Sequence, residues 1–218
     1  MEDILSYQLI ITFIMALVWA LLFLHKPEVR REMLVLSTLS LILLPLSLTA
    51  SSIAEEITVT LAQIQFIDLL FIFASAGIGG VIFHEIFGKH YHRLPKNKKK
   101  KASEQSIMSQ YWLLRLIFLL LAFVWTVLLL SIFFDLETPF ATFIAAIFVV
   151  VYIASHRHDL FVDSLMSGAI TAFLVLIGGA VAGLFFHPEG LTSLLLVAGA
   201  LGLALGPAYE YIRRFELV

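Results

Sequence analysis

The sequence predicts an all-α integral membrane protein with seven transmembrane helices, built from two parallel three-helix repeats joined by one linker helix. The first observation is composition: 61% of the 218 residues are hydrophobic and 14% are charged, with a mean hydropathy of +0.99. Soluble chains have about 45–50% apolar and about 25% charged residues. The apolar runs are continuous rather than alternating with a period of two, which favours helices over the strands of a membrane barrel.

The second observation is the number of apolar stretches. A helix needs about 20 mostly apolar residues to cross the hydrocarbon core. Seven stretches meet this need, and they are predicted as spans in chain order: Ile4–Leu24, Met33–Ala50, Leu61–Phe87, Leu113–Phe134, Pro139–Ser155, Leu160–Phe186 and Leu191–Tyr211. Gly-rich patches inside the third, sixth and seventh spans predict close helix packing.

The connecting segments alternate in charge, which supports an odd number of spans. Basic residues fall in the first, third and fifth connections and after the last span: Lys26, Arg30 and Arg31; Lys89 to Lys101; Arg157; Arg213 and Arg214. In the other connections the charged residues are all acids: Glu55 and Glu56; Asp135 and Glu137; Glu189. The positive-inside rule then places the N-terminus outside and the C-terminus in the cytoplasm, and we expect a multi-pass plasma-membrane protein. The basic Lys96–Lys101 loop is interpreted mainly as a topology determinant, and anionic lipid is its alternative partner.

The third observation is an internal repeat. The segment from His25 to Leu34 aligns without a gap on His156 to Leu165, and the alignment pairs Glu32 with Asp163. Farther along, Gly77 to Glu85 resembles Gly202 to Glu210. These matches predict a first three-helix repeat over 1–88, a basic loop and linker helix over 89–135, and a second three-helix repeat over 136–218.

Two acids, Glu85 and Glu210, are candidate functional groups because of their positions in the predicted helices. Glu85 and Glu210 lie at the C-terminal ends of the third and seventh spans, where the helix dipole opposes a negative charge, so a basic partner is expected nearby. His84, Arg157, Arg213 and Arg214 are the candidate partners. By contrast, Glu28, Glu32, Asp159 and Asp163 begin helices, where carboxylates are favoured for structural reasons.

Several chemistries are disfavoured. The chain has no cysteine, which excludes thiolate catalysis and cysteine-ligated metals. Its short basic cluster does not favour nucleic acid as a partner. Six of the seven histidines lie on the predicted cytoplasmic side: His25, His84, His90, His92, His156 and His158. Their spacing does not match a zinc-protease helix, so no metal and no cofactor are predicted.

Three groups of residues carry a resemblance to a known family. They are Lys26–Met33, Asp68–Phe71 with Gly77–Gly80, and Gly206–Glu210. The two-copy unit resembles the integral-membrane lycopene cyclase domain of bacteria, archaea and fungi. That family has a Pro-x-Glu-Glu/Asp sequence opening the last helix of each repeat. In this chain the corresponding residues are Gln65–Asp68, which keeps the final acid, and His187–Gly190, in which Glu189 is displaced.

The resemblance implies a redox-neutral cyclisation of a long isoprenoid or carotenoid in an apolar cavity between the repeats. Asp68 and Glu189 would be the first candidates for the catalytic acids, and Glu85 and Glu210 the second.

One alternative is a small transporter, or a lipid- or isoprenoid-binding membrane protein without catalysis. Another is an oxygenase with a histidine-bound metal.

Overall fold

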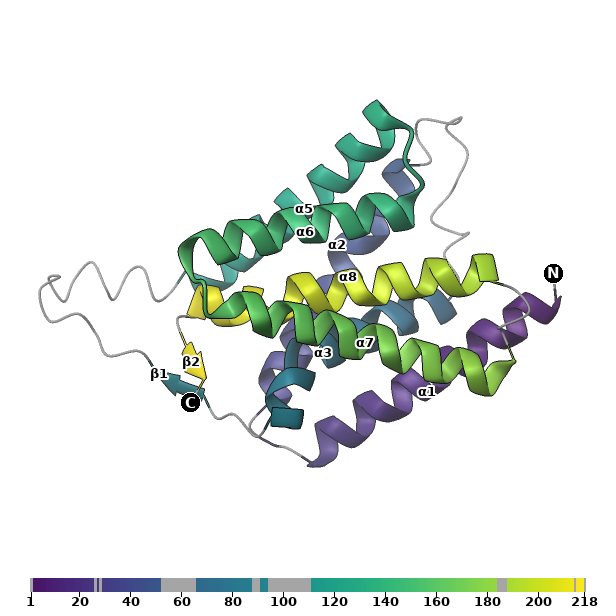
Figure 1. Ribbon diagram of the computed structural model, residues 1–218, viewed down its shortest axis with the longest axis horizontal. Helices are drawn as coiled ribbons and strands as arrows, with labels where there is room; N and C mark the ends of the chain where they lie inside the picture. The colour runs from purple at the N-terminus through teal and green to yellow at the C-terminus, as the bar shows by residue number, and fades with distance from the viewer. Residues whose placement is uncertain are drawn as a thin grey trace, which may run out of the picture.

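The computed structural model describes residues 2–25, 27, 29–51, 66–87, 91–93, 111–183, 188–213 and 215–217 (Figure 1). Side chains are described for 7–25, 27, 29–41, 66–83, 86, 111–183 and 190–212. In these ranges the chain forms seven helices: α1 (Glu2–His25), α2 (Arg30–Ser51), α3 (Phe66–Phe87), α5 (Trp112–Phe134), α6 (Thr138–His156), α7 (Leu160–Ala182) and α8 (Pro188–Arg213). The predicted helical fold is therefore confirmed.

Six of the seven helices are long and apolar enough to cross a membrane: α1, α3, α5, α6, α7 and α8. The seventh, α2, coincides with the predicted second span, but the side chains of its residues 42–51 lie outside the described part of the chain. Large apolar side chains face outward along the helices, and Phe118, Trp125 and Phe173 are each about 60% exposed. Extensive exposed apolar surface on helices of this length is typical of a membrane protein.

The predicted boundaries agree with the observed helix ends to within about three residues, except at the start of the third span and the end of the sixth. Pro139 follows the first residue of α6, where its missing N–H removes no intrahelical hydrogen bond. Gly183 ends α7 in the left-handed region at φ 75°, four residues before the predicted end of that span. Residues 61–65, the start of the predicted third span, lie outside the described residues.

Two helices form the centre of the bundle. Helix α3 packs on both α1 and α2, helix α8 packs on both α6 and α7, and α3 and α8 pack on each other. Helix α5 contacts α2, α6 and α8. In Figure 1 the start of α1 and the end of α8 lie at opposite ends of the bundle.

Small residues bring the two central helices into backbone contact. A Cβ on Gly79 of α3 would lie 2.7 Å from Cα of Gly202 of α8, and one on Gly206 would lie 2.9 Å from the carbonyl oxygen of Gly79. The Ser167 hydroxyl of α7 donates a hydrogen bond to that same carbonyl. The predicted packing role of these glycines is confirmed.

One element was not predicted. Tyr91–Arg93 (β1) and Phe215–Leu217 (β2) pair as a two-stranded antiparallel ribbon, with His92 opposite Glu216. Each strand has three residues, too few for a period-two pattern to be recognised in the sequence. The ribbon joins the segment that follows α3 to the segment that follows α8 (Figure 1).

Candidate functional site

A large pocket opens on the side of the bundle between α5, α6 and the end of α8. Its volume is about 870 Å³, within the range of about 300–1,000 Å³ typical of small-molecule sites. Most of its lining is apolar: Phe118, Leu119, Ala122, Phe123, Phe148, Val149 and Ile212. The remaining lining residues are Arg115, Thr126, Tyr152, His156, Arg157 and Tyr211.

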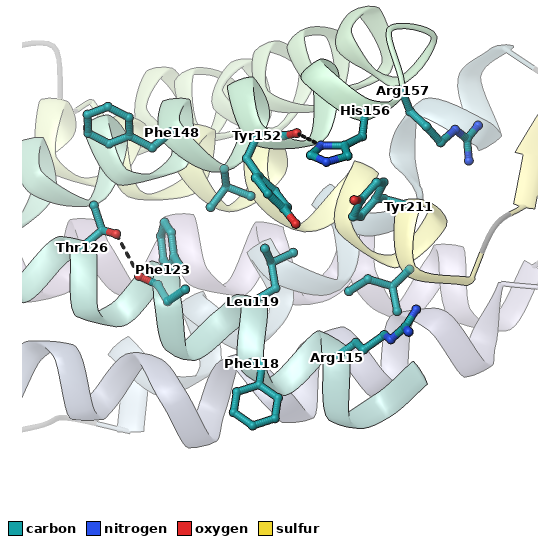
Figure 2. A pocket seen from close by; sticks show the side chains of 13 residues that line it. Arg115, Phe118, Leu119, Phe123, Thr126, Phe148, Tyr152, His156, Arg157 and Tyr211 are labelled. Carbon is teal, nitrogen blue, oxygen red and sulfur yellow. Dashed lines mark hydrogen bonds between the residues drawn. The ribbon is translucent and has the colours of Figure 1, made fainter. Parts of the chain in front are cut away.

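The polar side chains of the pocket gather at one end. Figure 2 shows Arg115, His156, Arg157 and the two tyrosines at the end where α5 begins and α6 and α8 finish, whereas Phe123, Thr126 and Phe148 lie toward the other end. The pocket is therefore amphipathic along its length. Its described lining contains two arginines and no carboxylate.

Aromatic contacts position His156 in this polar end. Its ring centroid lies 4.9 Å from that of Tyr152 and 6.0 Å from that of Tyr211. Its Nδ1 lies 3.0 Å from the backbone carbonyl oxygen of Tyr152. A proton on Nδ1 satisfies that carbonyl and leaves Nε2 as the nitrogen available to a ligand.

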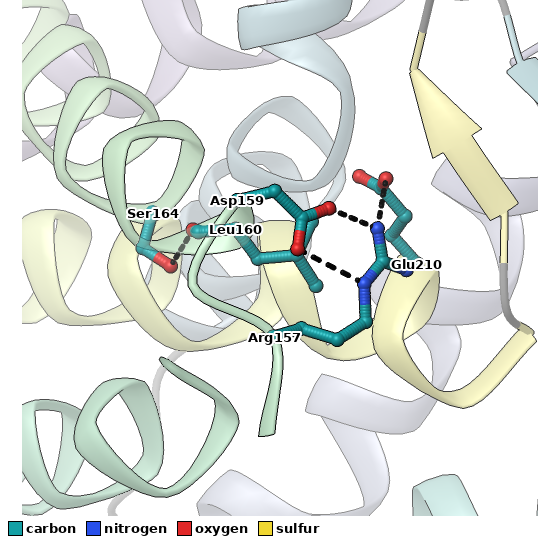
Figure 3. A network of polar contacts seen from close by, with 5 residues as sticks. All are labelled: Arg157, Asp159, Leu160, Ser164 and Glu210. Carbon is teal, nitrogen blue, oxygen red and sulfur yellow. Dashed lines mark hydrogen bonds and ion pairs between the residues drawn. The ribbon is translucent and has the colours of Figure 1, made fainter. Parts of the chain in front are cut away.

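Arg157 connects the pocket to a buried carboxylate (Figure 3). Its Nη2 lies 3.6 Å from Oε1 of Glu210, a residue only 1% exposed. Its guanidinium also contacts Asp159, with Nε 3.2 Å from Oδ1. The hydrogen bonds from Arg157 lower the pKa of Asp159, which lies between α6 and α7, against the smaller raising effect of burial.

The short connection between α6 and α7 sets this geometry. Arg157 is extended (φ −143°, ψ 91°), and its N–H donates to the carbonyl oxygen of Ile153. Leu160 N–H donates to the Arg157 carbonyl 3.2 Å away, and only the three residues 157–159 separate α6 from α7. Arg157 was one of the four basic residues considered as a partner of Glu210, and the structure brings this pair together.

The four predicted acids occupy the two ends of the bundle. Asp68 is half-buried in the first turn of α3, where the Gln8 side-chain amide donates a hydrogen bond to it. Glu85 lies near the other end of that helix, and Glu189 and Glu210 lie near opposite ends of α8. The side chains of Glu85 and Glu189 are outside the described part of the chain. At 1.5 Å per residue, Asp68 and Glu85 are separated by about 25 Å, and Glu189 and Glu210 by about 31 Å.

The pocket does not lie where a cavity was predicted. A space between the repeats was expected, but α3 and α8 meet there through Gly79 and Gly202. The open volume lies instead beside α5, the predicted linker helix. Neither Asp68 nor Glu210, the two predicted acids whose side chains are described, lines it.

The pocket residues Arg115, Tyr152 and Tyr211 were not among the predicted site residues. The signal for Arg115 was its charge just inside an otherwise apolar span. The tyrosines carried no distinct signal, because aromatic residues are expected at the ends of spans in any case. Among the described side chains, no group of three or more His, Asp or Glu residues is placed to hold a metal ion. The side chains of His84, His90, His92 and His187 lie outside that part.

Comparison of the chain with protein-family models, curated proteins and solved structures gave no match. The fold defines a helical protein with at least six helices suited to crossing a membrane. Its candidate site is a laterally placed, amphipathic pocket. Function is therefore inferred from this pocket.

Proposed function

We propose that this protein binds a single-chain lipid or isoprenoid from the membrane, without catalysis. The observation that carries the proposal is the pocket of about 870 Å³, apolar over most of its lining and polar at one end. A pocket of this kind suits a ligand with a long apolar body and a polar terminus. Because the pocket is framed by helices whose outer faces are apolar, the ligand would reach it from the bilayer.

The length of the pocket supports a ligand that occupies one leaflet. Its lining runs along α5 from Arg115 to Thr126, which corresponds to about 16 Å of helix. This is close to half of the hydrocarbon core, which is about 30 Å thick. The polar end lies at the basic end of the bundle, which we assign to the cytoplasmic side of the plasma membrane by the positive-inside rule.

The two-repeat arrangement is also a proposal, and burial supports it. In the gapless alignment of α2 on α7, the same positions are buried in both helices. Val29 and Leu160, Glu32 and Asp163, Leu36 and Ser167, and Ser40 and Thr171 are all at most 8% exposed. Leu34 and Leu165, which are aligned with each other, are 43% and 46% exposed. The buried positions recur at the same places along both helices, which favours duplication over a chance match of apolar residues.

A binding role has better support than the carotenoid cyclisation implied by the resemblance. Cyclisation requires an acid and a base beside the same end of one polyene. Asp68 and Glu210 belong to opposite ends of the bundle and lie outside the pocket lining. Conversion of lycopene to a cyclised pigment by the protein in a lycopene-accumulating host would contradict the non-catalytic part of the proposal.

The test is to fill the pocket with a side chain. Ala122 lines it and lies on an exposed face of α5, so Ala122→Trp would occupy ligand space. Ala180→Trp is the matched control, because Ala180 is an exposed residue of α7 that does not line the pocket. The measurement is binding of radiolabelled geranylgeraniol to the protein in phosphatidylcholine nanodiscs.

We expect wild type and Ala180→Trp to bind the alcohol equally, and Ala122→Trp to bind it at least about tenfold more weakly, a difference of about 1.4 kcal/mol. Absence of saturable binding to wild type of both geranylgeraniol and its monophosphate would overturn the proposal. Equal binding to both tryptophan variants would also overturn it, because the ligand would then lie elsewhere.

A further inference from the structure

We infer that the polar end of the pocket recognises an anionic headgroup, so that the ligand is a phosphorylated or carboxylated single-chain lipid rather than a neutral one. The inference rests on the proposed function and names the chemical class of its ligand. It is carried by Arg115, which lines the polar end of the pocket and forms no ion pair with a carboxylate of the described residues. An isoprenyl monophosphate is the ligand that we use to represent the class.

Arg115 is placed where a cation is normally unfavourable. It is the fourth residue of α5, and the N-terminal end of a helix carries partial positive charge. No carboxylate in the described part of the chain forms an ion pair with Arg115. A bound anion in the pocket would compensate the guanidinium.

Among the described residues, no side chain caps the N-terminal end of α5. Its N-cap residue is Tyr111, which makes no side-chain capping hydrogen bond, and its first turn contains no acid. The first backbone N–H groups of any helix have no acceptor within that helix. The first turn of α5 therefore adds no negative charge of its own beside Arg115.

The other side chains at this end are donors suited to an oxyanion. Figure 2 shows the Tyr152 and Tyr211 hydroxyls between His156 on one side and Arg115 on the other. The two tyrosine ring centroids are 6.1 Å apart. The His156 ring lies against both tyrosine rings at this end.

Arg115 is expected to supply most of the charge. Arg157 also lines the pocket, but Asp159 and Glu210 already contact its guanidinium and offset its charge. Arg115 has no such partner among the described carboxylates, and an arginine fork matches the geometry of a phosphate. The chain of the ligand would then run past Phe118, Phe123 and Phe148.

The test compares two ligands that differ only in the headgroup. Geranylgeranyl monophosphate and geranylgeraniol are titrated against the protein in phosphatidylcholine nanodiscs, and inorganic phosphate is added as a competitor. The variant is Arg115→Gln. The matched control is Arg31→Gln, which removes the same charge from the same end of the bundle. Arg31 lies over the Trp112 ring, 5.9 Å from its centroid, but does not line the pocket.

We expect wild type to bind the monophosphate at least about tenfold more tightly than the alcohol, and Arg115→Gln to lose most of this preference while still binding the alcohol. Arg31→Gln should keep the preference. Competition by inorganic phosphate at millimolar concentration would show that the headgroup site also accepts free phosphate. Its absence would show that the chain is required, and either result supports an anion site.

Equal affinity of wild type for the alcohol and the monophosphate would overturn this inference and leave the proposed function intact. Equal loss of preference in Arg31→Gln and Arg115→Gln would also overturn it, because the attraction would then be a property of the basic surface. Binding of neither ligand would instead contradict the proposed function itself.

Discussion

The contact between α3 and α8 gives a direct test of the fold. We consider Gly79→Ala, which adds one methyl group where the two helices meet. The new Cβ would lie 2.7 Å from Cα of Gly202 and 3.1 Å from its backbone nitrogen. Carbon atoms are in optimal contact at about 3.5–4.0 Å, so the helices would have to separate by about 1 Å, because the opposing atoms belong to the backbone.

Two effects of opposite sign decide the magnitude. Overpacking of a close contact costs about 1–3 kcal/mol, whereas alanine is favoured over glycine within a helix by about 1 kcal/mol. The separation also weakens neighbouring contacts at the crossing, including the hydrogen bond from Ser167 to the Gly79 carbonyl. We therefore expect Gly79→Ala to lower the free energy of unfolding by about 1 kcal/mol.

Gly190→Ala is the matched control. Gly190 also lies in a helix, α8, but a Cβ there meets nothing within 4 Å among the described residues, so only the gain in helix propensity is expected. Thermal unfolding in detergent, followed by circular dichroism, measures both variants. A difference of 1 kcal/mol corresponds to a shift of about 2–4 °C in Tm for a domain of 150–250 residues. A Tm for Gly79→Ala equal to or above that of Gly190→Ala would refute the close approach of α3 and α8.

Two further predictions concern the charges around Arg157. Arg157→Gln removes an ionic contact from the buried Glu210 and is expected to lower the free energy of unfolding by about 1–3 kcal/mol. Adding Glu210→Gln should restore part of that loss. Additive losses of the two substitutions in a double-mutant cycle would contradict the pairing. Asp159 is largely exposed and its pKa is lowered by Arg157, so at pH 7 Asp159→Asn should be less stable than wild type by about 0.2–1 kcal/mol. Because a lowered carboxyl pKa stabilises the fold above the unfolded-state value of about 3.9, this difference should vanish as the pH falls through the folded-state pKa. A difference that persists in unfolding measurements below that pH would show that protonation of Asp159 is not its cause.

The helices could be predicted because their signal is local. A run of about 20 apolar residues specifies a spanning helix whatever its neighbours are, and Leu113–Phe134 differs from α5 by one residue. The helix ends were predicted less accurately where backbone conformation rather than composition determines them. Gly183, for example, ends α7 by adopting φ 75° within a stretch that reads as apolar up to Phe186.

The pocket could not be predicted because it depends on the packing of helices that are distant in sequence. Arg115 and Tyr211 are almost a hundred residues apart, and neither belongs to a recognisable motif. Glu210 was identified as an unusual acid from the unfavourable dipole at the end of its helix, and the structure places Arg157 beside it. A charge in an unfavourable position is readable from sequence, whereas a cavity requires knowledge of which helices are neighbours.

The position of α5 relates the proposed repeat to the pocket. In that repeat α1, α2 and α3 are equivalent to α6, α7 and α8. If a twofold axis related the two repeats, a packing contact between α1 and α7 would be matched by an equivalent contact between α6 and α2. Helices α1 and α7 do pack together, but α5 contacts both α2 and α6 on the other side. The helix without a counterpart thus separates the pair that the symmetry would bring together, and the pocket lies along this helix. Residues that are aligned in the proposed repeat, such as Glu32 and Asp163, therefore lie in the core, whereas the candidate ligand site lies along the helix that has no counterpart in that repeat.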